Sequence, residues 1–175
     1  VALQNGNGIH VIKRAGRLKA LNEALDGATL RGRAGIAHTR WATHGGPTDA
    51  NAHPHSDCAE RISVVHNGII ENFQELRSRL ASAGHAFRSE TDSEVIAHLL
   101  EEAYRRHKDP AGAMRSALSK LKGSFAVAAI FADAPDTLVA ARKESPLVIG
   151  LGDGENFIAS DVPAIVNRTR NVLIL

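Results

Sequence analysis

The sequence predicts an α+β fold, and two observations support this class. Stretches in which apolar residues recur at helical spacing gather in the middle of the chain, whereas short β-rich runs lie toward both ends. No repeating strand–helix–strand pattern, which would indicate a parallel sheet, runs through the 175 residues. Strands and helices that segregate along the chain are typical of α+β domains. This length suits one domain that buries a sizeable core.

The N-terminal part is predicted to begin with a hairpin and a short helix. A turn rich in Gly and Asn, residues 4–8, separates two apolar runs, which is a hairpin signal. Leucines recur at helical spacing in residues 17–25, and Asp26-Gly27 ends that helix. The expected strands of this part are residues 1–3, 9–14, 34–41 and 61–66, the last of them ending at Asn67-Gly68.

Three helices are predicted in the middle of the chain. Residues 72–83 place apolar side chains on one face and stop at a glycine. A second helix runs through residues 95–100, with Thr91 or Asp92 as its N-cap. A third covers residues 110–121, because its leading proline fits the first turn of a helix.

The last third of the chain is predicted to be an antiparallel meander. Short β-rich runs alternate there with turns rich in Asp, Pro and Gly. The expected strands are residues 125–131, 137–141, 147–151 and 157–159. One or two helical turns in residues 161–167 precede a final strand.

Composition excludes several classes of protein. The net charge is +2 and the basic residues are spread along the chain, which argues against a nucleic-acid-binding stripe. No apolar run reaches the length of a membrane span. Cys58 is the only cysteine, which favours a reducing, cytoplasmic setting. Because both ends are apolar strands and no initiator methionine is present, we expect a fragment of a longer protein.

The strongest functional signal is a polar stretch of loops and strand ends. It combines an arginine, histidines, a threonine, asparagines and glycines, a density typical of a small-molecule site. No serine or cysteine in it stands where a nucleophile would be expected. Its segments are Arg40-Trp41-Ala42-Thr43-His44-Gly45, Asn51-Ala52-His53-Pro54-His55 and Val65-His66-Asn67-Gly68.

Three candidate site features each have a structural and a functional interpretation. Arg40 suits either a surface ion pair or a bidentate contact with a ligand carboxylate. Asn67-Gly68 suits either a turn or an oxyanion hole, made by an amide side chain and a backbone N–H. Asp92, at a helix start, is either a cap or a partner for a ligand ammonium group.

The histidines raise a metal hypothesis, which the sequence does not favour. His44, His53, His55 and His66 offer imidazoles that zinc accepts. Their spacing matches no compact zinc motif, and histidines also serve as hydrogen-bond donors in loops. Cys58 has no base beside it in the sequence, so we interpret it as a passive loop thiol rather than a nucleophile.

Taken together, these motifs resemble the glutaminase domains of glutamine–fructose-6-phosphate aminotransferases, which are class II amidotransferases. The resemblance covers the chain from about residue 16 onward, with its motifs in the same order. They are Gly35 through Gly45, Asn51 through His55, Val64 through Asn72, Ser89 through Asp92, Glu94 through Leu99, Ser145 through Gly152 and Gly154 through Asp161.

The resemblance implies a fold and a set of glutamine-binding residues. The fold would be the four-layer αββα sandwich of N-terminal-nucleophile hydrolases, here truncated at its N-terminus. Arg40 would hold the α-carboxylate of L-glutamine and Asp92 its α-ammonium group. Thr43, His44 and His53 would line the same pocket.

It also implies how the reaction would proceed. Asn67 and the Gly68 N–H would form the oxyanion hole, and Trp41 would gate the passage of ammonia to a second active site. That second site belongs to C-terminal sugar-isomerase domains, which bind fructose 6-phosphate and are absent from residues 1–175. The full-length enzyme would be a homodimer, and neither a metal nor another cofactor is implied.

The chain departs from the family at the nucleophile. Family members begin with a cysteine whose thiol attacks the glutamine amide while its own α-amino group acts as base. Here Val1 stands first, and a glutamine-covering loop rich in Arg, Gly, Tyr and Asp is also missing. Three alternatives stay open: a phosphoribosyl-pyrophosphate-type amidotransferase, a catalytically inactive glutamine-binding module and a metal-dependent hydrolase.

We therefore expect a polypeptide of residues 1–175 alone to release no glutamate from glutamine. Cys58 cannot replace the missing nucleophile, because an internal residue has no free α-amino group. A coupled glutamate assay checks this expectation. A rate comparable to that of an intact glutaminase domain would contradict it.

Overall fold

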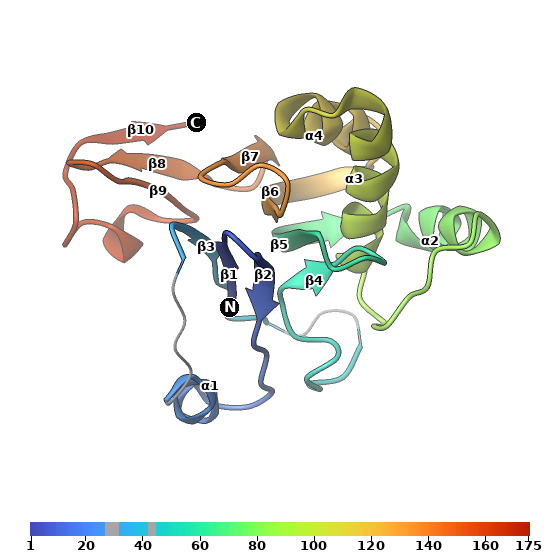
Figure 1. The fold of residues 1–175 in the computed structure, drawn as a ribbon, viewed down its shortest axis with the longest axis horizontal. Coiled ribbons are helices and arrows are strands. Elements are labelled where there is room, and N and C mark those ends of the chain that lie inside the picture. Colours follow the sequence, from blue (N-terminus) through green and yellow to red (C-terminus); the bar gives the residue numbers. More distant parts are fainter. Residues whose placement is uncertain (27–31, 42–44) are drawn as a thin grey trace.

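Helices and antiparallel strands occupy separate layers in the computed structural model, which describes residues 1–26, 32–41 and 45–175 (Figure 1). The thin grey segments of the figure are not described. The helices are α1 (Leu18–Leu25), α2 (Phe73–Ser82), α3 (Glu94–His107) and α4 (Pro110–Leu118). A short 3-10 helix, η1 (Val162–Ala164), lies where the sequence predicts one or two helical turns. None of the helices in the described ranges is long and apolar enough to cross a membrane.

The central sheet has the strand order β4-β5-β6-β7, and neighbouring strands are antiparallel. Its strands are β4 (His55–Ser56), β5 (Ile62–Ile70), β6 (Gly123–Phe131) and β7 (Leu138–Lys143). Alternate residues of β6 face opposite sides of the sheet, as the period of a strand requires. Phe125, Val127 and Phe131 join the core shared with α2, α3 and α4, whereas Ile130 joins a smaller core on the other face.

Two three-stranded sheets complete the fold. The first has the order β2-β1-β3 and the second the order β10-β8-β9. The smaller core includes Ala2 and Ile36 of the first sheet together with Ile130, so this sheet packs on the central one. The strands are β1 (Ala2–Asn5), β2 (Gly8–Val11), β3 (Ala34–Ile36), β8 (Val148–Leu151), β9 (Asn156–Ala159) and β10 (Val172–Ile174).

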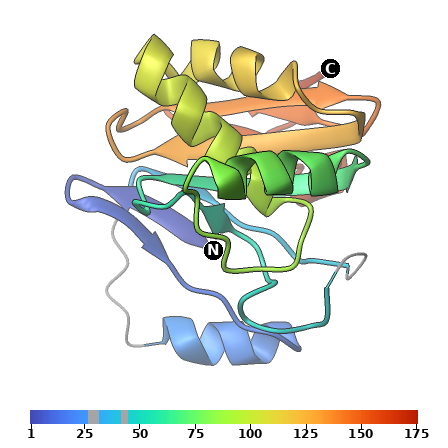
Figure 2. The same cartoon turned by 90° about the vertical axis from the view of Figure 1, so that its right-hand side faces the viewer.

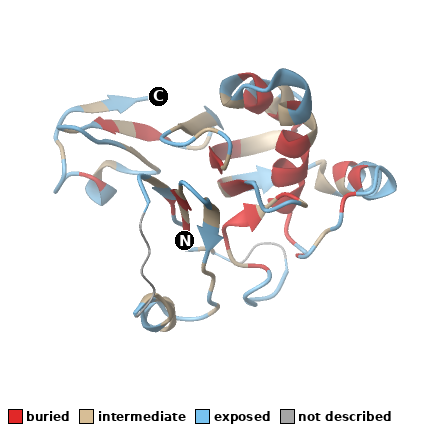
Figure 3. Ribbon diagram, viewed as in Figure 1, coloured by how far each residue is buried: buried red, intermediate tan, exposed pale blue. Residues whose placement is uncertain are grey.

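The layers confirm the predicted α+β class, with antiparallel sheets face to face and helices outside them. Buried residues concentrate on α3 and on the central sheet (Figure 3). In contrast, α1 lies apart from the other elements in both views and buries none of its residues (Figure 2). The core therefore belongs to the sheets and to helices α2–α4.

Two predicted strands end at the wrong residue. The strand predicted at residues 34–41 ends at Ile36, because β1 pairs with β3 only over Ala34–Ile36. The strand predicted at residues 61–66 continues to Ile70, because β6 offers partners along its whole length. Asn67-Gly68 consequently lies inside a strand instead of ending it.

The predicted meander is also wrong in its connectivity. β6 and β7 pair in the central sheet, but the chain then changes sheets and β8 pairs with β9 and β10. The two-residue strand β4 lies in a segment for which the sequence signals no strand. Local turn signals mark where strands end, and they carry no information on which sheet a strand joins.

We predict that Gly68→Ala lowers the free energy of unfolding by about 2–4 kcal/mol. Gly68 has a φ of 121°, and a Cβ there would lie 2.0 Å from the carbonyl oxygen of Ser124 on β6. The added methyl group would force the central strands apart. Urea denaturation measures the effect.

Gly6→Ala is the matched control. A Cβ at Gly6 would meet no atom within 4 Å, and the turn is exposed. We expect this variant to stay within about 0.5 kcal/mol of the parent. Equal stability of both variants would show that the close approach of β5 and β6 is not a constraint.

Candidate active site

A cavity of about 180 Å³ lies where the segment after β3, the middle of β5 and the start of α3 meet. It collects the sequence-predicted site residues that the structure describes, namely Arg40, Trp41, His53, Asn67, Gly68 and Asp92. Thr43 and His44 lie outside the described residues. His38, Thr39, His66 and Ser93 complete the lining. Segments far apart in the sequence thus contribute to one small hollow.

Asn67 is positioned by β5 and by a hydrogen bond to His38. The pairing of β5 with β6 sets Asn67 opposite Ala126. The Asn67 Oδ1 lies 2.5 Å from the His38 Nε2. Because an amide oxygen only accepts hydrogen bonds, His38 donates here from Nε2. The two N–H groups on the Asn67 Nδ2 then remain available to a ligand oxygen.

Asp92 is fixed at the end of β5 rather than acting as a helix cap. Its Oδ2 accepts a hydrogen bond from the Ile70 backbone N–H at 2.9 Å, and the residue is buried. The prediction of Thr91 or Asp92 as N-cap is wrong, since Ser93 occupies that position and makes no side-chain cap bond. Ser93 instead uses its hydroxyl between the His66 Nδ1, at 2.8 Å, and the Asp92 Oδ1, at 3.4 Å.

Arg40 lies at the rim of the cavity and contacts the loop that follows it. Its guanidinium donates to the carbonyl oxygens of Gly45, at 3.0 Å, and Gly46, at 3.3 Å. Asn51 holds the same loop, because its Nδ2 donates to the Gly46 oxygen and its Oδ1 accepts from the Glu90 N–H. The fork of Arg40 is therefore oriented by backbone that is itself tied to the segment before α3.

Trp41 follows Arg40 on the same rim and is almost entirely exposed. Its side chain lines the cavity, yet 89% of the residue surface is accessible to solvent. Tryptophan side chains are highly buried on average in folded proteins. This exposure distinguishes Trp41 from the buried residues around it.

Buried imidazoles surround the cavity and stay neutral. The rings of His38 and His53 have centroids 4.2 Å apart, and those of His53 and His55 are 4.8 Å apart. Burial lowers the pKa of His55 to about 3. Burial also lowers the pKa of His66 to about 4, against the opposing charge of Asp92. Loss of hydration is the main cause of the lowered pKa of His38 and His53 as well.

Neutral histidines leave two formal charges in the cavity lining. Arg40 is the cation and Asp92 the anion among the residues that line it. Such a pair of opposite charges in a small cavity complements a zwitterion. An α-amino acid is a zwitterion, with its carboxylate and ammonium group on one carbon.

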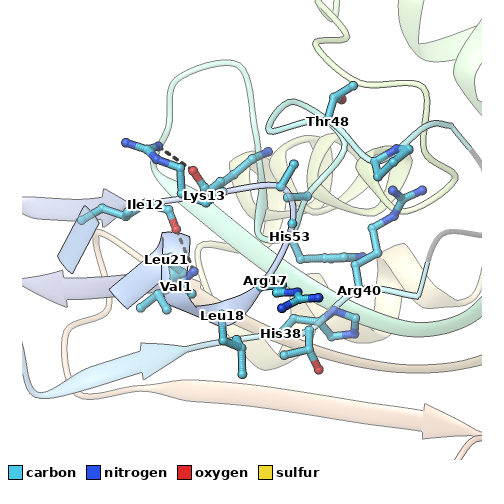
Figure 4. Close-up of a pocket in the computed structure, with 16 residues that line it drawn as sticks. Val1, Ile12, Lys13, Arg17, Leu18, Leu21, His38, Arg40, Thr48 and His53 are labelled. Carbon is cyan, nitrogen blue, oxygen red and sulfur yellow. Dashed lines mark hydrogen bonds between the residues drawn. The ribbon is translucent and has the colours of Figure 1, made fainter. Parts of the chain in front are cut away.

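A larger hollow of about 360 Å³ adjoins the cavity (Figure 4). The two share His38, Thr39, Arg40 and His53 as lining residues. In the figure His38, Arg40 and His53 lie on the opposite side of the hollow from Leu18 and Leu21 of α1. The hollow thus gives the Arg40 side of the cavity an open approach.

The lining residues missed by reasoning from the sequence are His38, Thr39 and Ser93. His38 stands in the same motif as Arg40, and Ser93 directly follows Asp92, so both were near a recognised signal. Of the four histidines of the metal hypothesis, His44 lies outside the described residues, and His53, His55 and His66 belong to no group of potential metal ligands among the residues that are described. Within the described part of the chain, potential metal ligands converge at another place, beside Cys58.

Comparisons with known proteins agree on one family. The model of a family described as "Glutamine amidotransferase domain" matches residues 38–167. The glutamine–fructose-6-phosphate aminotransferases (isomerizing) of Thermococcus kodakarensis and Streptomyces coelicolor are 54% and 55% identical over the whole chain. The chain spans about 29% of the length of these relatives.

Two solved structures share the fold of this chain. The glutamine phosphoribosylpyrophosphate amidotransferase of B. subtilis, complexed with ADP and GMP, gives a TM-score of 0.78 over 99% of this chain and 37% of its own. Its sequence identity is 24%. An allosteric regulatory enzyme of purine biosynthesis gives 0.75 at 25% identity. The predicted N-terminal-nucleophile type of αββα fold is thereby confirmed.

We predict that stability falls as the pH falls below about 6.5, in part through His66. An unfolded histidine has a pKa of about 6.5, whereas folding lowers that of His66 to about 4. Between these values the unfolded chain binds a proton that the folded chain does not. Stability therefore rises with pH in this window, by about 1.4 kcal/mol per pH unit for each such group.

The pH dependence is measured by urea unfolding between pH 4.5 and 6.5. His66→Gln should reduce the slope of the unfolding free energy against pH by the contribution of one bound proton. The same substitution at the exposed His10 should leave this slope unaltered. Identical slopes for the parent and His66→Gln would show that His66 is not a buried neutral imidazole in the native state.

Proposed function

We propose, from the membership of this chain in the family of glutamine amidotransferase domains, that it is the glutaminase domain of a glutamine–fructose-6-phosphate aminotransferase. In this role it releases ammonia from L-glutamine for the conversion of fructose 6-phosphate to glucosamine 6-phosphate. The observation that carries the proposal is the cavity with Arg40 and Asp92 as its two charges, beside Asn67 and Gly68.

Glutamine is proposed to bind through its α-carbon groups. The planar guanidinium of Arg40 suits the α-carboxylate, since it presents parallel N–H donors. Asp92 accepts from the α-ammonium group, and its burial strengthens that attraction. His53 lines the same cavity, and the proposal adds Thr43 and His44 from the neighbouring segment. Because the imidazoles are neutral, they do not compete with the guanidinium of Arg40 for the α-carboxylate of glutamine.

The side-chain amide of glutamine is proposed to react beside Asn67 and Gly68. A thiolate attacks the amide carbon, and the carbonyl oxygen becomes an oxyanion. The Asn67 Nδ2 and the Gly68 N–H donate to that oxygen, while protonated nitrogen leaves as ammonia. Water then hydrolyses the thioester and releases glutamate.

The attacking thiol is assigned to an N-terminal cysteine of the intact enzyme. Cys58 does not line the cavity and has no free α-amino group. No metal or organic cofactor is needed for this sequence of steps. This chain is therefore proposed to bind glutamine, whereas another segment of the enzyme supplies the nucleophile.

The remaining parts of the enzyme are proposed from the relatives. Sugar-isomerase domains that bind fructose 6-phosphate would follow this domain, and the enzyme would act as a homodimer. Trp41, exposed on the cavity rim, is placed to gate the passage of ammonia toward them. A reducing cytoplasm is the proposed compartment, because the single cysteine of these residues forms no disulfide.

The sugar enzyme is favoured over the phosphoribosyl-pyrophosphate type by sequence identity. Relatives named glutamine–fructose-6-phosphate aminotransferase match the whole chain at 54–55% identity. The solved B. subtilis structure shares 24% identity, a likeness that extends to the fold alone. The two activities are separated by supplying either fructose 6-phosphate or phosphoribosyl pyrophosphate to the full-length protein and identifying the aminated product.

We predict distinct kinetic effects for the two halves of the site in the full-length enzyme. Arg40→Gln and Asp92→Asn should raise the KM for glutamine, because each removes a charge that grips the α-carbon groups. Asn67→Ala should lower kcat by about 10²–10³-fold, because the oxyanion loses a donor. Glutamate release and glucosamine 6-phosphate formation are the measurements.

Arg170→Gln is the matched control, since Arg170 is exposed and does not line the cavity. Unchanged kinetics in Arg40→Gln and Asp92→Asn would refute the glutamine-binding roles. A full-length protein that binds glutamine but releases no glutamate would instead identify an inactive binding module.

A further inference from the structure

A second cluster of ligating side chains lies away from the active-site cavity. Cys58 precedes β5, His85 follows α2, and His98 and Glu101 belong to α3. One ligand atom from each lies within 4.8 Å of those of the other three. None of the four lines the cavity assigned to glutamine, so the proposed function leaves them unexplained.

The distances within the cluster fit four ligands around one ion. The Cys58 Sγ lies 3.5 Å from the His85 Nδ1 and 3.6 Å from the His98 Nδ1. The Glu101 Oε2 lies 3.1 Å from the His85 Nδ1 and 3.7 Å from the His98 Nδ1. For a tetrahedral zinc ion, ordinary bond lengths place sulfur and nitrogen ligands about 3.6 Å apart and nitrogen and oxygen ligands about 3.4 Å apart.

The backbone explains why these atoms converge. His98 and Glu101 are three residues apart on α3 and therefore share one face of the helix. The Cys58 N–H donates to the Glu101 Oε2 at 3.3 Å, which holds the turn before β5 against α3. His85 stacks near His98, with ring centroids 5.0 Å apart. Three segments distant in sequence are thus tied together at one point.

A carboxylate lies near the second ring nitrogen of each imidazole. The His98 Nε2 lies 3.8 Å from the Glu94 Oε1, and the His85 Nε2 lies 3.7 Å from the Glu102 Oε1. Arg105 pairs with the outer oxygen of Glu101. Metal-binding histidines commonly direct their second nitrogen toward a carboxylate, which orients the ring. In this cluster the second nitrogen of each ring has a carboxylate within 4 Å, and the His98 Nε2 makes no hydrogen bond among the described residues.

Burial and charge fit a divalent ion as well. His98, Glu101 and His85 are buried, whereas Cys58 is half-buried and leaves a way in. A thiolate and a carboxylate together carry two negative charges, which a divalent ion neutralises. A thiolate with two imidazoles favours zinc over hard cations such as magnesium and calcium.

We propose that Cys58, His85, His98 and Glu101 form a structural zinc site. All four protein ligands are supplied, so no open position is left for a substrate, as in structural rather than catalytic zinc sites. Zinc binding displaces the thiol proton to solvent and leaves the metal's oxidation state unchanged. The ion would fasten the turn before β5 and the segment after α2 to α3. The earlier view of Cys58 as a passive loop thiol is then wrong.

The test uses the full-length protein, purified without a histidine tag and stripped with a chelator. Zinc is added back in competition with a coloured chelator, and bound metal is counted per chain. We expect one equivalent bound by the parent, and an affinity at least about 100-fold lower in Cys58→Ser and His85→Gln. His10→Gln, at an exposed histidine of β2, is the control and should bind as the parent does.

Cobalt provides a measurement that does not depend on a variant folding. Co²⁺ bound to the parent protein should show a thiolate-to-metal charge-transfer band, which a site without the Cys58 thiolate would lack. Zinc should also raise the melting temperature of the parent more than that of Cys58→Ser. Equal zinc binding by the parent and Cys58→Ser, or bound Co²⁺ without the thiolate band, would overturn the proposal in favour of a hydrogen-bonded cluster.

Discussion

The nine-residue pairing of β5 with β6 is the constraint on which the rest of the structure depends. Its two faces carry the two cores, one shared with helices α2–α4 and one with the β2-β1-β3 sheet. The strands approach so closely at Gly68 that a side chain is excluded there. Because Asn67 and Gly68 lie within this ladder, the candidate oxyanion donors are held in place by the pairing of the two strands. The end of the same strand holds Asp92 through the N–H of Ile70.

Burial of uncharged imidazoles determines the electrostatics of the site. His53, His55 and His66 lose more hydration than their neighbours can replace, so they remain neutral near pH 7. The charges of Arg40 and Asp92 are then not masked by cations between them. In a cavity with little water such charges act strongly on a ligand. The histidines thus add no positive charge to the candidate site.

Reasoning from the sequence predicted the helices better than the sheets, and the described residues that it named for the site line one cavity. Leu76 and Leu80 recur at helical spacing and are buried in α2, because a helix face is encoded locally. Strand pairing is not local, so the step of the chain from β7 to a different sheet at β8 left no signal. Asp92 resembled a helix cap because it precedes α3, although its partner Ile70 lies 22 residues away. For the same reason the sequence could not place His85 and His98 beside Cys58.

The exposure of Trp41 on the rim of the cavity has one further consequence. It is the only tryptophan among these residues, and its indole stands in solvent on the rim of the cavity. Indole emission shifts to shorter wavelength when water around the ring is replaced by apolar surroundings. The domain therefore carries an intrinsic fluorophore at the mouth of the candidate site. Ligand entry and any closure over the cavity can be followed in real time without a label.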